Sequence, residues 1–362
     1  MDSVANNILD AIKNIDWNPI FITGYFIVEN ALKNKKYSIK KDENLFKDVN
    51  GIYFPPKLKK RYKNINFKEL IQKEFGDSLY TFAQTLIENF SSMNLINFYN
   101  NINELKINSR DKFEFHDLKG ELYLLIFGNK FSGCYSPTLN KIYAYEEFKL
   151  VLFHELFHMA STFYDKKNDI VYSGFSQRCI KKYVGVGIDE GYTEHLTEVY
   201  FANKPLRATI TYKYLKNVAN LIDLGIGKDE MQKFYLNSNL NGLINEMSKY
   251  VGVENALKFI ESTDYIYNNL EKSIKNKKKL EKHLKFVNII TLSIYTNYLV
   301  KVYMEKNIPL SKLNLGITGL FNNTLRVECK NTKYDCIPTK QTIDAIISDT
   351  LKKYENIHKK NI

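Results

Sequence analysis

The pattern of apolar and polar positions predicts a mainly helical chain with a group of short strands near its middle. Residues 67–105 carry apolar residues at helical spacing, with a break at Ser91–Ser92. Residues 121–127 and 141–145 are rich in β-branched and aromatic residues, which favour strands. From residue 209 onward the pattern is helical again, most clearly over 240–250, 253–262, 284–304 and 342–354. This order of elements predicts an α+β fold.

A buried helix is expected over residues 150–160, and it contains an H-E-x-x-H motif, His154-Glu155-Leu156-Phe157-His158. Residues four apart on an α-helix point the same way, so both imidazoles share a side. The opposite side is apolar, with Leu152, Phe153, Leu156, Met159 and Ala160. Two imidazole nitrogens one helical turn apart begin a metal site. Glu155 stands where a carboxylate could take a proton from water.

A third ligand is available in the downstream segment Gly187–Glu198. Glu190 and Glu194 lie four residues apart and share a helix face. Glu190 could bind the metal, and Glu194 could accept the free N–H of a ligand histidine and so fix its tautomer. Gly191 would let this second helix approach the first closely. His195 is a rival ligand, but it points about 100° away from Glu194, so we expect a surface or packing role for it.

Together, H-E-L-F-H and the downstream D-E-G-Y-T-E resemble the motifs of gluzincin metallopeptidases, over residues 141–200. The resemblance implies a zincin-like core with a small mixed sheet and an active-site helix, one Zn²⁺ per chain, and hydrolysis of a peptide or protein substrate. It implies roles for five residues: His154, His158 and Glu190 as zinc ligands, Glu155 as general base, and Glu194 as the hydrogen-bond partner of a ligand histidine. No G-x-M-E-N-like string precedes the helix, so an endopeptidase is favoured over an aminopeptidase.

The pattern of elements along the chain divides it into a mostly helical N-terminal region (1–112), a core that holds the two motifs (113–205) and a helical C-terminal subdomain (206–362). Strand 141–145 would line the edge of the cleft and pair with an extended substrate; an ordinary interior strand is the alternative. Asp189 stands where the family often has Asn, and we expect this departure to leave the metal unaffected. Two apolar stretches lie between the two motif-bearing helices, at 170–175 and 183–186. We expect them to form a β-hairpin that covers one side of the cleft.

The charge distribution raises a second class of function. The formal net charge is +12, and residues 33–63 hold eleven Lys or Arg against three acids. A second basic run covers 272–285. Such runs can contact nucleic acid, but these lack the interleaved aromatic and glycine pattern of an RNA-binding sheet, so we expect solvated helix faces and no nucleic-acid partner. Two alternatives stay open: a catalytically silent zinc-binding scaffold or regulatory protein of peptidase ancestry, and a basic nucleic-acid-binding protein with a chance motif.

The remaining features concern location. The first residues carry no positive region followed by a long apolar stretch, which argues against a secretory signal. The longest uncharged run, 286–300, is short and polar for a membrane span, so we expect a core helix there. The four cysteines show no C-x-x-C spacing and are expected to be reduced. These features predict a cytoplasmic protein with no membrane contact, and they leave the oligomeric state open.

Overall fold

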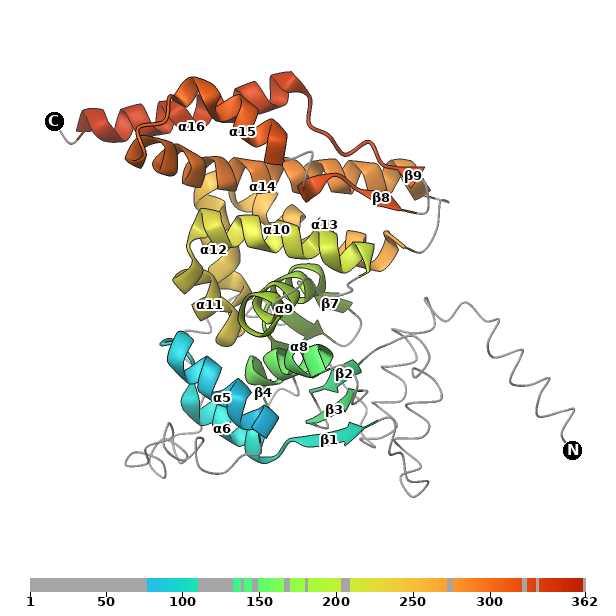
Figure 1. The fold of residues 1–362 in the computed structure, drawn as a ribbon. Helices are drawn as coiled ribbons and strands as arrows, with labels where there is room; N and C mark the ends of the chain where they lie inside the picture. Colours follow the sequence, from blue (N-terminus) through green and yellow to red (C-terminus); the bar gives the residue numbers. More distant parts are fainter. Residues whose placement is uncertain are drawn as a thin grey trace, which may run out of the picture.

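The computed structural model describes residues 77–109, 133–137, 140–144, 149–165, 170–179, 182–202, 209–271, 276–320, 324–329 and 332–360 (Figure 1). The strand expected at 121–127 and the basic run at 33–63 lie outside these residues. The described chain is mostly helical with small sheets, which confirms the α+β class.

The first described part places two helices beside a small mixed sheet. Its elements are α5 (Asp77–Asn89), α6 (Leu95–Asn103), β1 (Lys106–Ser109), β2 (Gly133–Ser136) and β3 (Lys141–Ala144). The strand order is β1-β3-β2, with β3 parallel to β1 and antiparallel to β2. The strand expected at 141–145 is therefore the central one, and β2 lies at the edge among the described strands. The interior alternative is the one observed, because β1 pairs with β3 from far upstream in the chain.

The motif-bearing helices follow, separated by a second sheet. This part comprises α8 (Lys149–Ala160), β4 (Thr162–Asp165), β5 (Ile170–Ser173), β6 (Ser176–Cys179), β7 (Lys182–Val184) and α9 (Val186–Phe201). The sheet is an antiparallel meander in the order β4-β5-β6-β7. The expected simple hairpin is thus wrong in detail, because β6 lies between its two strands. The polar sequence of β6, Ser-Gln-Arg-Cys, carries little strand signal.

The C-terminal part is helical, as expected. Its elements are α10 (Ile210–Ile226), α11 (Lys228–Leu236), α12 (Leu240–Val251), α13 (Val253–Asn269), α14 (Lys277–Glu305), η3 (Leu310–Lys312), α15 (Leu313–Leu320), β8 (Glu328–Cys329), β9 (Thr332–Lys333) and α16 (Lys340–Lys360). Figure 1 shows the helices stacked from α5 and α6 through α8, α9 and α10 to α14 and α16. Within the described ranges, no helix combines the length and apolar character needed to cross a bilayer.

An aromatic cluster holds α8 between α5 and α9. The ring of Phe157 in α8 lies 5.2 Å from that of Phe82 and 5.8 Å from that of Phe201, and Phe153 stacks on Phe201 at 4.2 Å. Phe82 and Phe157 are fully buried. Each buried aromatic ring stabilises the fold by about 1.5–3 kcal/mol, so this cluster fixes the rotation of α8 about its own axis and, with it, the direction of its polar side chains.

The start of α9 is capped by a residue from α13. The backbone N–H groups of Gly185 and Gly187 each donate to the Asp264 carboxylate at 2.8 Å. Gly185 has no side chain to cap the helix itself and adopts a left-handed conformation, with φ of 84°. A side chain at Gly187 would lie 2.3 Å from the Thr263 carbonyl oxygen, so α13 packs directly on the backbone of α9. Asp264 therefore sets the position of the helix that carries Glu190.

Gly191 allows a close helix contact, but with a different partner from the one expected. A Cβ at Gly191 would lie 2.5 Å from the backbone carbonyl oxygen of Leu215 in α10. The expected close approach to α8 is wrong, because Gly191 lies on the face of α9 that points away from α8 and toward α10. Gly191 thus joins α9 to the C-terminal helices.

Candidate metal centre

Two imidazoles project from α8 toward α9. The Nε2 atoms of His154 and His158 lie 3.2 Å apart, and both side chains are largely buried. The end of α8 is tied to the second sheet, since the His158 carbonyl accepts the hydroxyl of Thr162 at 2.7 Å and that of Ser173 at 3.2 Å. The backbone of the second histidine is therefore fixed by β4 and β5.

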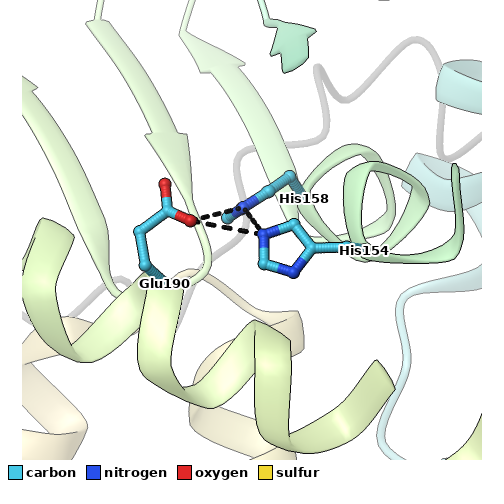
Figure 2. A group of neighbouring side chains, drawn as sticks. All are labelled: His154, His158 and Glu190. Atoms are coloured by element: carbon cyan, nitrogen blue, oxygen red, sulfur yellow. Dashed lines mark hydrogen bonds and ion pairs between the residues drawn. The ribbon is translucent and has the colours of Figure 1, made fainter. Parts of the chain in front are cut away.

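Glu190 from α9 completes a group of three donor atoms. Its Oε2 lies 3.3 Å from Nε2 of His154 and 3.5 Å from Nε2 of His158. Figure 2 shows the three side chains pointing toward one another from the two helices. Ligands about 2.0–2.1 Å from a tetrahedral metal ion lie about 3.3–3.4 Å apart. The observed separations match this spacing, so His154, His158 and Glu190 could hold a metal ion.

The far nitrogen of each histidine faces a carboxylate of α9. His154 Nδ1 lies 3.0 Å from Glu194 Oε2, and His158 Nδ1 lies 3.4 Å from Asp189 Oδ2. The first contact matches the partner expected for Glu194. The second was missed, because Asp189 was expected to leave the metal unaffected. The sequence did offer a signal for this contact, because Asp189 stands directly before Glu190. Each ligand histidine needs an acceptor for its far N–H, and Asp189 and Glu194 lie on either side of Glu190 in the sequence.

The two histidines of this group and the carboxylates around them stabilise each other's charged forms. Burial lowers the pKa of His154, but hydrogen bonds to Glu190 and Glu194 outweigh it and raise the pKa to about 9. Burial likewise opposes protonation of His158, yet Glu190 and Asp189 raise its pKa well above the usual value. Burial would raise the pKa of Glu190, but the two histidines lower it well below its usual range. The carboxylates thus favour positive charge between them, and a bound cation would take the place of protons.

Glu155 lies beside this cluster on α8. Burial raises the pKa of its carboxyl group, and the charges of His154 and His158 oppose that shift. A hydrogen bond from the backbone N–H of Tyr135 in β2 also favours the ionised form. Glu155 is therefore a buried carboxylate held between the two histidines and the edge strand of the mixed sheet.

Two tyrosines from the C-terminal helices lie beside the candidate metal ligands. The ring of Tyr212 in α10 lies 6.0 Å from the His154 ring in an edge-on arrangement. Tyr267 in α13 is hydrogen-bonded to Tyr212, with its ring 6.1 Å away. Burial raises the pKa of both phenols, and the Glu190 carboxylate adds to this effect. Both are protonated donors at neutral pH, and nothing in the sequence singles them out among 26 tyrosines.

His195 lies outside the group of ligands, as expected. Its Nε2 is 3.8 Å from Asp223 Oδ2 in α10, and its ring contacts that of Tyr192 at 5.8 Å. The Tyr192 hydroxyl donates to the other oxygen of Asp223 at 2.7 Å. This histidine packs α9 against α10.

Comparison of the chain with protein-family models, with curated proteins and with solved structures gives no match. The gluzincin resemblance therefore rests on the two motifs and on the geometry described above, and the zincin-like core stays a prediction.

Proposed function

We propose that the chain is a zinc-dependent peptidase of the gluzincin type. The observation that carries the proposal is the convergence of His154 Nε2, His158 Nε2 and Glu190 Oε2 beside the buried carboxylate of Glu155. Two histidines and a glutamate form a known ligand set of catalytic zinc, in which the fourth position stays open. Zinc in such a set acts as a Lewis acid that polarises a carbonyl group and activates water as a nucleophile.

Glu155 has the features of the general base. It would take a proton from the attacking water and pass it to the leaving amine. Its raised pKa favours this exchange, because a base with a pKa nearer neutrality can also return the proton. The Tyr135 N–H orients the carboxylate from β2. Among the described strands β2 is an edge, and an extended peptide paired with it would place its backbone next to Glu155, as an endopeptidase requires.

Tyr212 is the donor that we assign to the oxyanion. We expect Tyr212→Phe to lower kcat about 10²–10³-fold, as loss of one oxyanion donor does, with KM and zinc affinity little changed. Steady-state kinetics on a peptide substrate and a zinc titration measure these effects. Tyr267→Phe is the matched control, because it removes a neighbouring phenol and should have a smaller effect. Equal losses in the two variants, or wild-type kcat in Tyr212→Phe, would assign the donor elsewhere.

Metal analysis joined to an activity assay tests the whole proposal. We expect the purified chain to contain one zinc per molecule and to cleave an unfolded protein or a peptide library. Dialysis against a chelator should abolish cleavage, and one equivalent of Zn²⁺ should restore it. Stoichiometric zinc without cleavage would favour the silent scaffold, and a chain that binds no metal would reject both functions.

A further inference from the structure

Both oxygens of the Asp189 carboxylate are used, and each serves a different part of the fold. Oδ2 lies 3.4 Å from Nδ1 of His158. Oδ1 accepts the backbone N–H of Phe175 at 2.8 Å, in the turn between β5 and β6. The side chain is almost fully buried, with 2 % of the residue exposed, so water cannot replace either partner.

The turn is shaped to fit this carboxylate. Gly174 adopts a φ of 54°, and a Cβ there would lie 2.0 Å from Asp189 Oδ1. Phe175 is fully buried, and its ring lies 5.5 Å from the rings of both Tyr192 and Tyr235. The turn therefore closes directly over Asp189 and is held there by the aromatic core.

We propose that Asp189 is a positioning residue that couples metal binding at His158 to the β5–β6 turn. For Nε2 of His158 to bind a metal, the ring proton must reside on Nδ1, and Asp189 Oδ2 is the acceptor that keeps it there. The other oxygen of the same carboxylate holds the turn. This inference rests on the metal binding in the proposed function and is independent of peptide cleavage.

A carboxylate can serve both partners, and an amide cannot. Asn has one acceptor oxygen and an NH₂ group that only donates. If the oxygen of an asparagine accepted the Phe175 N–H, its NH₂ would face His158 Nδ1 and favour the tautomer with the proton on Nε2. If the side chain turned over, the NH₂ would face the Phe175 N–H. The presence of Asp at position 189 thus has a consequence for the metal, contrary to the expectation from sequence.

Two measurements on the full chain test the coupling. The first is zinc affinity, by competition with a chelator, and the second is hydrogen exchange at the Phe175 amide with and without zinc. In the wild type, zinc should slow exchange at the turn. Asp189→Asn can keep only one of the two partners, so zinc should no longer protect the turn. With the amide oxygen on the Phe175 N–H, zinc affinity should also fall about 10–100-fold.

Glu194→Gln is the matched control, because Glu194 supports the other histidine and does not contact the turn. Glu194→Gln should also lower zinc affinity, but zinc should still slow hydrogen exchange at the Phe175 amide. Wild-type protection of Phe175 by zinc in Asp189→Asn, or equal loss of turn protection in both variants, would overturn the coupling. A wild type that binds no zinc would instead reject the metal centre itself.

Gly174→Ala tests the coupling from the side of the turn. The added methyl group would displace Asp189 Oδ1, so zinc affinity should fall although Gly174 contacts none of the three ligands. Circular dichroism establishes whether each variant is folded. A folded Gly174→Ala protein with wild-type zinc affinity would contradict the proposal even if Asp189→Asn failed to fold.

Discussion

Replacing Glu155 by Gln is expected to lower kcat/KM for peptide hydrolysis about 10²–10⁴-fold, the usual contribution of a general base, while zinc stays bound. Gln has nearly the same shape and can still accept the Tyr135 N–H that now reaches the carboxylate. It cannot take a proton from water. Because burial disfavours the charge of Glu155, the neutral variant should also fold at least as well as the wild type.

Zinc content and hydrolysis must be measured on the same preparation of Glu155→Gln. Glu198→Gln is a suitable control, because Glu198 lies on α9 and pairs with Lys216 at 2.6 Å, outside the ligand group. That variant should retain full activity. Cleavage by Glu155→Gln at the wild-type rate would remove Glu155 from the mechanism, whatever the zinc content.

Replacing Glu190 by Ala is expected to lower zinc affinity more than about 100-fold. Loss of a residue that only supports a ligand costs roughly 10–100-fold, and this change removes a direct ligand. Two imidazoles on one helix would remain, and they do not fill a tetrahedral site. The Glu190 side chain is 17 % exposed, so its truncation should leave the helix packing intact. Competition titration of the metal-free protein gives the affinity, and mass spectrometry of the purified protein gives the metal content.

Glu198→Ala serves as the control for this change, since it removes a carboxylate of the same helix that pairs with Lys216 and is not one of the three proposed ligands. It should bind zinc like the wild type. If Glu190→Ala retained stoichiometric zinc at wild-type affinity, another residue would supply the third ligand. His195 would not be that residue, because it faces Asp223.

The parts of the site that follow from short-range geometry were predictable from sequence. Helical periodicity alone places His154, Glu155 and His158 within one turn of α8, and an apolar run fixes which side is buried. Glu190 and Glu194 could be proposed because their spacing also follows from one helix. The helical segments of the C-terminal part were likewise visible as amphipathic patterns.

The missed features depend on contacts between elements that are distant in the chain. Asp189 acquires its proposed role because the β5–β6 turn and His158 meet at its carboxylate. Tyr212 reaches the site only through the way α10 packs on α9. The central place of β3 depends on parallel pairing with β1, which hydrophobic patterning does not encode. In each case the local sequence is compatible with several neighbours, and tertiary packing selects one.

The Asp264 cap has a consequence for the order of events during protein synthesis. A nascent chain that has emerged only through α9 already carries both histidines, Glu155 and Glu190, but the N-terminus of α9 still lacks the carboxylate that receives the amides of Gly185 and Gly187. Asp264 leaves the ribosome well after Glu190. Loading of the proposed metal should therefore follow the emergence of α13. A ribosome stalled before that helix should expose a chain in which the motif is complete but Glu190 is incompletely held.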